Sequence, residues 1–336
     1  PQDYDGTANY TEADIQQVAR SVTGWWVLRR NTTISTRFDA SRHDAGTKTV
    51  FGVSGNYDLD GLIDHIFAYR SQQSARFICK KLYCFFVSAE PNQSVINELA
   101  DYMVQQNFNI AATLQKLLSS EHFFSPELYA CRIKSPLEWY MGFLREIEMT
   151  PSDARKEYIR VQMQDFSNEE IMKPVDVFGW PGYNPPKTDN VPGHFAWMNT
   201  NLMPVRWQGL SALMNGQGNG LLEYNPVNLV RRISTPSDPL AVARDLASYI
   251  LPVDIEEAGI HPVEEDFAGD PDYAPNTEGY TAKEIDLAKI LLGELPHYEW
   301  GYREPSGGQA YFTRGTQYQI QQYLAYLIQL PAYQLI

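Results

Sequence analysis

The sequence predicts an all-α protein, a multi-helix globular array with one small β-hairpin and a long loop rich in proline and tryptophan. Two observations predict this class. Apolar residues recur at helical spacing through most of the 336 residues, and several helix-start signals precede these runs. Hydrophobic residues make up 43% and charged residues 20% of the chain, the composition of an ordinary folded protein.

The first helix is predicted from a capping box. Thr11 stands three residues before Asp14, and apolar positions from Ile15 onward recur at helical spacing. Gly24 ends this helix. Between 32 and 53 the pattern changes to two short strands, Thr33–Phe38 and Lys48–Phe51, around a turn at His43–Gly46, and we expect these strands to pair as the hairpin.

Helices return from about residue 60 to 150. Their starts are marked by Asn92, Asn109 and the sequence Ser135-Pro-Leu-Glu138, in which proline takes the first helical position. A further helix is expected between residues 151 and 173.

The loop 174–198 contains five prolines and is not expected to form regular structure. Beyond it, helices are expected near Leu202, after Asp238, after the second capping box at Thr281–Glu284, and from Gln317 to Leu330. We therefore divide the chain into an N-terminal helical region, 1–173, and a region 174–336 with the loop and the later helices, and expect the two to pack as one unit.

Charge and hydropathy exclude several classes of partner. The chain has 27 basic and 41 acidic residues and a net charge of −14, so we predict no nucleic-acid binding. No apolar run approaches the ~20 residues that span a bilayer, so no transmembrane segment is predicted. Cys79, Cys84 and Cys131 are too few for a disulfide framework and are interpreted as small hydrophobic residues.

His43, Asp44 and Lys48 form the densest group of polar residues and are the candidate catalytic residues. The imidazole could act as a general base or metal ligand, with Asp44 orienting it. The alternative is structural, because Asp44-Ala-Gly46 is also a typical turn that His43 could cap.

The loop around Trp180 and Trp197 is the candidate ligand-binding site. Two tryptophans interrupt a helical chain, and polar residues follow that could hold a ligand by hydrogen bonds: Asn199, Asn201 and Arg206. The same side chains could instead satisfy backbone groups that the proline-rich loop leaves open.

Calcium is the one metal considered, and no cofactor is predicted. Asn56–Gly61 resembles the start of an EF-hand loop, but its twelfth position is Phe67 instead of an acid. Helix capping by Asp58 or Asp60 explains the same residues. The acidic residues Asp266, Asp270, Asp272 and Glu278 are a weak alternative site, or simply a solvated loop.

Phosphate-loop, dinucleotide-binding, Gly-x-Ser-x-Gly and His-Glu-x-x-His motifs are missing. These absences leave no common nucleotide-dependent or hydrolytic signature, although a glycosidase with two carboxylates would leave none either.

Six ordered segments resemble the bacterial family catalogued as domain of unknown function 1800. They are Tyr10–Trp25, His43–Gly52, Ser74–Leu82, Leu118–Phe123, the pair Gly179–Gly182 and Trp197–Thr200, and Leu330–Leu335. The resemblance implies a helical fold and export to the bacterial envelope, in the periplasm or at the cell surface, but no reaction. Family members usually carry more helical sequence before the first segment, so we expect this chain to match the C-terminal part of the family's length. The insertion 183–192 also separates the two tryptophans more than the family pattern does.

Two hypotheses of function follow. The first is an exported envelope protein that acts by binding or assembly through aromatic loops, with other envelope proteins, a small or glycan ligand, or the missing N-terminal portion of its own precursor as partner. The alternative is a metal-assisted or cofactor-poor envelope enzyme, such as a hydrolase, that uses His43, Asp44 and Lys48 near the Trp180–Trp197 loop.

Overall fold

The computed structural model describes residues 8–30, 33–161, 169, 172–174, 179–183, 193–198, 200–214, 226–303, 311–312 and 314–336. The chain divides into two compact units, and each is described by itself. The first comprises Pro1–Tyr83 and Pro91–Ser120, and the second comprises Cys84–Glu90 and Glu121–Ile336. The boundary expected at 173/174 falls inside the second unit.

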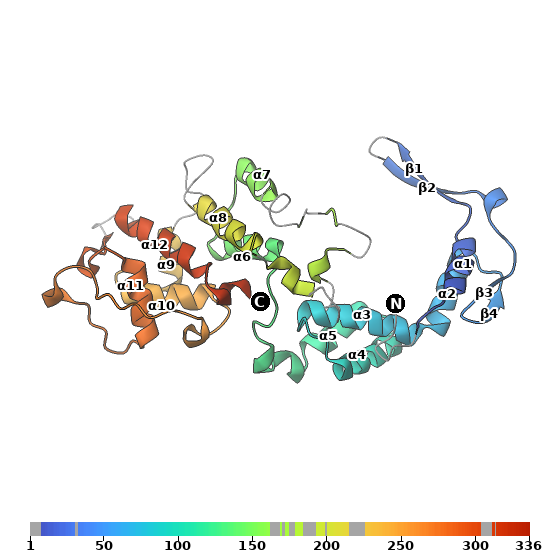
Figure 1. Cartoon of the computed structure of the whole chain (residues 1–336), viewed down its shortest axis with the longest axis horizontal. Coiled ribbons are helices and arrows are strands. Elements are labelled where there is room, and N and C mark those ends of the chain that lie inside the picture. The colour runs from blue at the N-terminus through green and yellow to red at the C-terminus, as the bar shows by residue number, and fades with distance from the viewer. Residues whose placement is uncertain are drawn as a thin grey trace. The chain divides into compact units, whose positions relative to one another are not determined.

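The first unit is built from helices that start where the sequence signals predict. Thr11 forms a complete capping box with Asp14, and Asp58, Asn92 and Asn109 each accept hydrogen bonds from the first turn of the helix that follows. Helices α4 and α5 lie side by side (Figure 1). The helices are α1 (Glu12–Ser21), α2 (Leu59–Tyr69), α3 (Ser71–Phe86), whose last residues belong to the second unit, α4 (Gln93–Gln105) and α5 (Ile110–Leu118).

The expected hairpin is wrong in its pairing. Both predicted strands exist, but β2 (Thr33–Phe38) pairs with β1 (Trp25–Arg30), and β3 (Lys48–Val50) pairs with β4 (Val53–Gly55). The register joins Arg30 to Thr33 and Val50 to Val53, so each pair closes over two residues. Closing a two-residue connection costs less chain entropy than closing the long connection that we expected between β2 and β3, and this difference favours the observed pairing.

The second unit is also mainly helical, which confirms the predicted fold class. Ser135 and Thr281 form complete capping boxes with Glu138 and Glu284, and Asp238 caps the helix that follows it. The helices are α6 (Pro136–Glu146), α7 (Asp153–Val161), α8 (Leu202–Met214), α9 (Pro226–Ile233), α10 (Pro239–Ile250), α11 (Ala282–Leu292) and α12 (Arg314–Leu327), and a third small strand pair joins β5 (Tyr302–Arg303) to β6 (Tyr311–Phe312).

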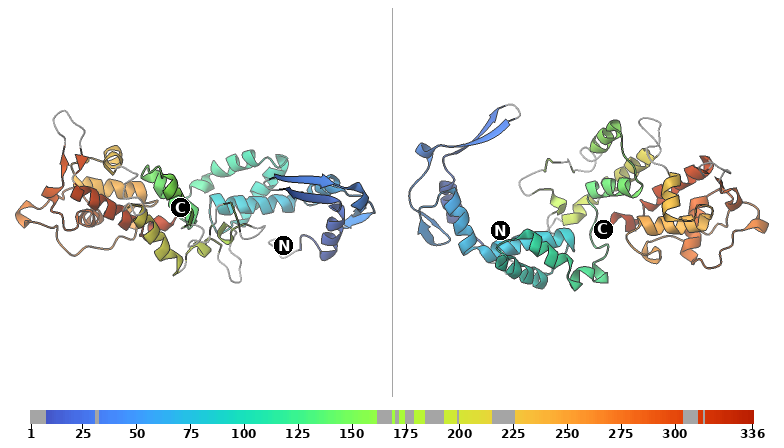
Figure 2. Two further views of the ribbon diagram at one scale, coloured as in Figure 1. Left: turned by 90° about the horizontal axis from the view of Figure 1, so that it is seen from above. Right: turned by 180° about the vertical axis from the view of Figure 1, so that it is seen from behind.

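The core of the second unit lies among α6, α10, α11 and α12. Helices α10 and α11 pack side by side (Figures 1 and 2), and the buried Tyr323 hydroxyl of α12 donates to the Ala243 carbonyl of α10 at 2.7 Å. The C-terminal residues return to the segment before α6, where the Lys134 amide donates to the Gln334 carbonyl at 2.8 Å. This return fixes the start of α6, on which the candidate site is built.

The three cysteines are free thiols. Cys79 and Cys84 are buried, and burial raises the pKa of the Cys79 thiol to about 12, which suits a small hydrophobic residue and not a nucleophile. Within the described part of the chain, no helix combines the length and the apolar character that crossing a bilayer requires.

Candidate functional site

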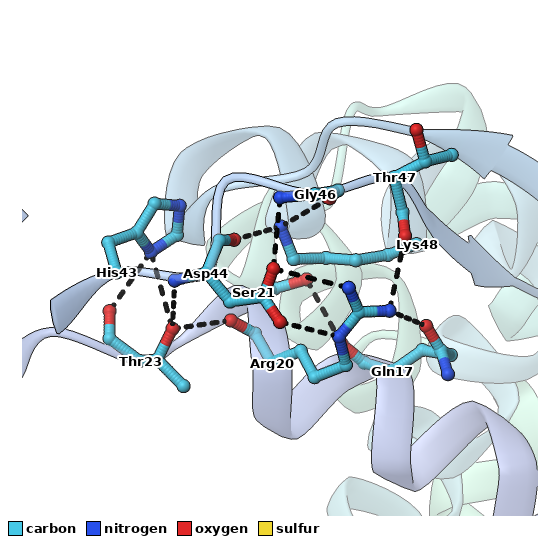
Figure 3. Close-up of polar contacts among 9 residues, drawn as sticks. All are labelled: Gln17, Arg20, Ser21, Thr23, His43, Asp44, Gly46, Thr47 and Lys48. Atoms are coloured by element: carbon cyan, nitrogen blue, oxygen red, sulfur yellow. Dashed lines mark hydrogen bonds and ion pairs between the residues drawn. The ribbon is translucent and has the colours of Figure 1, made fainter.

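Lys48 lies at the centre of the first unit's polar network (Figure 3). Its side chain is fully buried on β3, and Nζ donates to the carbonyl oxygens of Asp44 at 2.6 Å and Gly46 at 3.1 Å. The ammonium therefore replaces the hydration of two turn carbonyls and holds the 44–46 turn against β3.

The Asp44 carboxylate is bound to Arg20 of α1 instead of to the imidazole we expected it to orient. Arg20 Nε and Nη2 lie 2.7 and 3.2 Å from its two oxygens, and the Gly46 amide donates to one of them at 2.9 Å. The hydrogen bonds from Arg20 and Gly46 lower the pKa of Asp44 to about 2. Asp44 is thus a fixed anion that joins the turn to α1.

The imidazole of His43 contacts a third part of the chain. Its Nδ1 lies 3.0 Å from the Thr23 carbonyl oxygen, so Nδ1 carries the hydrogen and donates it. The ring packs against Phe38 with centroids 5.6 Å apart. His43, Asp44 and Lys48 therefore lie together. Asp44 and Lys48 hold the 44–46 turn, whereas the imidazole of His43 contacts Thr23 and Phe38 and does not cap the turn.

The calcium candidates make contacts typical of turns. Asp58 caps α2 by accepting from the Gly61 amide at 2.9 Å, and Asp270 accepts from the Asp272 amide at 3.0 Å. In the described residues, no three His, Cys, Asp or Glu side chains are grouped so that they could hold a metal ion. Asp266 and Glu278 accordingly join no such group.

In the second unit, Trp180 and Trp197 both pack against the same tyrosine, Tyr183. Tyr183 packs edge-on against Trp180 at 6.2 Å and against Trp197 at 5.5 Å, measured between ring centroids. The insertion between the tryptophans does not keep them apart. Trp180 directly precedes one short 3-10 helix, Pro181–Tyr183, and Trp197 is the last residue of another, Gly193–Trp197.

Tyr183 also ties this loop to the start of α6. Its hydroxyl lies 2.7 Å from Ser135 Oγ and 2.8 Å from Glu169 Oε1. The other oxygen of Glu169 accepts from the Leu137 amide at 2.8 Å, in the first turn of α6. Burial raises the pKa of the Glu169 carboxyl. Glu169 was not predicted, because its neighbourhood in the sequence carries no motif.

Arg206 lies behind this corner and is fully buried on α8. Its Nη1 donates to the Lys134 carbonyl at 3.1 Å, one residue before Ser135. Among the described residues, Nε and Nη2 have no hydrogen-bond acceptor. Burial lowers the pKa of the guanidinium to about 10, against the opposing charges of Glu169 and Glu138. We call Glu169, Trp180, Tyr183, Trp197 and Arg206 the Trp–Arg cluster.

Most of the buried polar atoms in and around the Trp–Arg cluster that have no partner among the described residues are donors, and Gln334 Oε1 is an acceptor among them. In the part of the chain that the structure describes, these buried donors without an acceptor include Nε1 of Trp139, Trp180, Trp197 and Trp207 and the hydroxyl of Tyr140. Of the other two predicted ligand-binding residues, Asn201 is exposed, and Asn199 lies outside the described residues.

Lys134 is a further buried cation, and the sequence analysis did not single it out. Its Nζ lies 3.7 Å from the centroid of the Tyr333 ring, and burial lowers its pKa to about 8. Glu146, whose own pKa is raised by burial, accepts from the Tyr333 hydroxyl at 2.9 Å. A lone lysine before a helix start gives no sign in the sequence that it is buried.

The fold and these contacts define a mainly helical protein whose second unit holds a buried, donor-rich corner of tryptophan and arginine. The chain belongs to the family described as protein of unknown function (DUF1800), whose family model matches residues 5–335. The match runs along essentially the whole chain and is not confined to a C-terminal part. Comparison with curated proteins and with solved structures gave no significant match.

Proposed function

We propose that this protein acts by binding, and that the Trp–Arg cluster receives a ligand carrying a carboxylate or phosphate group. The observation that carries this proposal is the edge of the Arg206 guanidinium, Nε and Nη2, which has no acceptor among the described residues. We call it the free edge of Arg206. Nε and Nη2 lie on one side of the guanidinium, and together they match two oxygens of an oxyanion.

The energetics favour a ligand over a purely structural role. A buried guanidinium that lacks an acceptor on one edge loses hydration without full compensation, and the lowered pKa of Arg206 expresses that loss. The Nη1 hydrogen bond to the Lys134 carbonyl offsets only part of that loss. An oxyanion would restore the missing hydrogen bonds as charge-assisted ones, in a region shielded from water.

The surrounding groups support the class of ligand. Indole N–H groups and the Tyr140 hydroxyl can donate to further oxygens, and aromatic faces can pack against a sugar ring. A sugar acid combines both features and is our preferred ligand class.

Export to the periplasm or cell surface, and assembly there with other envelope proteins, are part of the proposal and are supported by the family resemblance alone. Fractionation of cells that express the natural gene would test the location. The alternative of an envelope hydrolase using His43, Asp44 and Lys48 has no contact among the described residues in its favour.

The binding proposal is tested by thermal unfolding with glucuronate, phosphate and glucose. A ligand at ten times its Kd adds about 1.4 kcal/mol to the free energy of unfolding, which raises the Tm of a chain of this size by about 2 °C. We expect glucuronate to raise the Tm and glucose to leave it unchanged, and the phosphate arm separates carboxylate from phosphate recognition.

Arg206→Lys is the matched variant, because lysine keeps the charge and loses the paired edge. It should fold and lose most of the response to the oxyanion. An unchanged Tm of the wild type with both oxyanions, or an equal response in Arg206→Lys, would overturn the proposal.

A further inference from the structure

The first unit contains an apolar pocket that shares no residue with the Trp–Arg cluster. A pocket of about 650 Å³ opens between α1, α2 and α3, which is the size of pockets that hold small molecules. Each helix contributes two apolar side chains to it: Ile15 and Val18, Ile66 and Phe67, and Phe77 and Ile78.

The apolar lining is exposed to an unusual degree. Ile15, Phe67 and Phe77 keep 46%, 44% and 55% of their surface accessible, although all three face the same pocket. Single exposed apolar residues are ordinary, but several gathered around one hollow mark a binding surface. Covering them would remove apolar area from water at about 25 cal/mol per Å².

The charges at the pocket are already neutralised and bound. Asp14 accepts from the Phe51 amide at 2.7 Å and from Thr11. Arg70 donates to the Asn9 and Tyr69 carbonyls and lies 4.5 Å from the centroid of the Phe51 ring. One cation and one anion, each with partners, leave no net charge for a charged ligand to meet, so the pocket favours a neutral one.

Uncharged polar groups also line the pocket, and two of them lie on α3. The side chains of Gln73 and Ser74, in the first turn of α3, have no hydrogen-bond partner among the described residues. They can bind the hydroxyl, ester or amide of a ligand whose apolar part fills the rest of the pocket.

We propose that the first unit binds a small neutral amphiphile, an apolar chain or ring with one uncharged polar head, in the pocket between α1, α2 and α3.

The proposal is tested on the whole chain with the neutral fluorescent probe N-phenyl-1-naphthylamine. Decanol and decanoate then compete with the probe, since they share a chain and differ in head charge. We expect saturable binding of one probe per chain, and displacement by decanol at a concentration at least tenfold lower than by decanoate.

Phe77→Glu places a charge on the exposed part of the lining and should weaken probe binding at least tenfold. Ile63→Glu is the matched control, because Ile63 is a similarly exposed apolar residue of α2 outside the pocket, and its probe affinity should equal that of the wild type. Ser74→Ala should weaken decanol more than the probe.

Three outcomes would overturn the proposal: no saturable probe binding, equal loss in Phe77→Glu and Ile63→Glu, or tighter binding of decanoate than of decanol. A dimer that Phe77→Glu dissociates, together with no probe binding, would assign the pocket to a second copy of the chain instead. None of these results depends on Arg206. A negative result here would therefore leave the proposed function at the Trp–Arg cluster untouched, and a negative result there would leave this inference untouched.

Discussion

The indole of Trp197 lies directly against the backbone of Gly182. A Cβ atom at position 182 would stand 1.9 Å from Trp197 Cε2, far inside any real contact distance. The short helices Pro181–Tyr183 and Gly193–Trp197 can therefore pack this closely only because residue 182 has no side chain. The Trp–Arg cluster depends on this contact.

Gly182→Ala should displace the Trp197 ring and loosen the loop. Neither the backbone nor the buried indole can move freely, so we expect the free energy of unfolding to fall by about 1–3 kcal/mol. Tryptophan fluorescence should shift as the ring moves, and the response to an oxyanion should weaken with it. Equilibrium unfolding in urea, followed by fluorescence and circular dichroism, measures both effects.

Gly142→Ala is the control, and we expect it to change the free energy of unfolding in the opposite direction. Gly142 lies inside α6, and a Cβ there would meet nothing within 4 Å. Alanine favours a helix over glycine by up to about 1 kcal/mol, so this variant should be slightly more stable than the wild type. A loss of stability of similar size in both variants would contradict the packing we describe at Gly182.

Lys48→Met should destabilise the first unit, although methionine is apolar and similar in length. The substitution leaves the Asp44 and Gly46 carbonyls without their buried donor, and we expect a loss of about 2–4 kcal/mol. Lys116→Met is the control, because Lys116 forms an exposed ion pair with Glu98 and should change stability by less than about 1 kcal/mol. Equal effects of the two substitutions would show that the ammonium does not hold the turn.

Lys134 should make stability depend on pH in the alkaline range. Its pKa is about 8 in the folded chain and 10.5 in the unfolded one, so between these values the unfolded chain binds more protons. The penalty for burying the charged amine is largest below pH 8 and shrinks as the pH rises toward 10.5. A pKa shift of this size corresponds to about 3 kcal/mol in the free energy of unfolding.

Lys134→Met removes this dependence. We expect the stability of the variant relative to the wild type to decline by about 3 kcal/mol between pH 7 and pH 10.5, as the wild-type lysine loses its charge. Lys134→Arg stays charged throughout this range and should gain no stability relative to Lys134→Met. Urea unfolding at half-unit pH steps gives the curves. Parallel curves for wild type and Lys134→Met would contradict the lowered pKa.

Local signals in the sequence predicted local structure well. Thr11, Ser135 and Thr281 start helices as capping boxes do, because their partners lie three residues away in the same turn. The predicted strand pairing was wrong for two reasons. Pairing depends on the lengths of the alternative connections, which the strand pattern does not show. Trp25–Arg30 also lacks the alternation of apolar and polar residues that would mark it as a strand.

Contacts between distant segments could be predicted only in part. Trp180, Trp197 and Arg206 were singled out by residue type, and the structure brings them together around Tyr183 and the start of α6. Arg20 lies 24 residues from Asp44, and no sequence pattern links them. The burial of Lys134 depends in the same way on Tyr333, at the other end of the second unit.

The central claim is that Arg206 is buried with a free edge that a ligand fills. Equilibrium unfolding of Arg206→Met without ligand, beside Arg132→Met, tests it most directly. Arg132 already holds a carboxylate, Glu138, at 2.7 and 3.3 Å, so its loss should lower stability by about 1–3 kcal/mol. For Arg206→Met we expect a change of less than about 1 kcal/mol, because methionine removes an incompletely paired charge but also the Nη1 donor of the Lys134 carbonyl. A loss in Arg206→Met as large as in Arg132→Met would mean that the guanidinium is already satisfied within the chain, and would contradict the account.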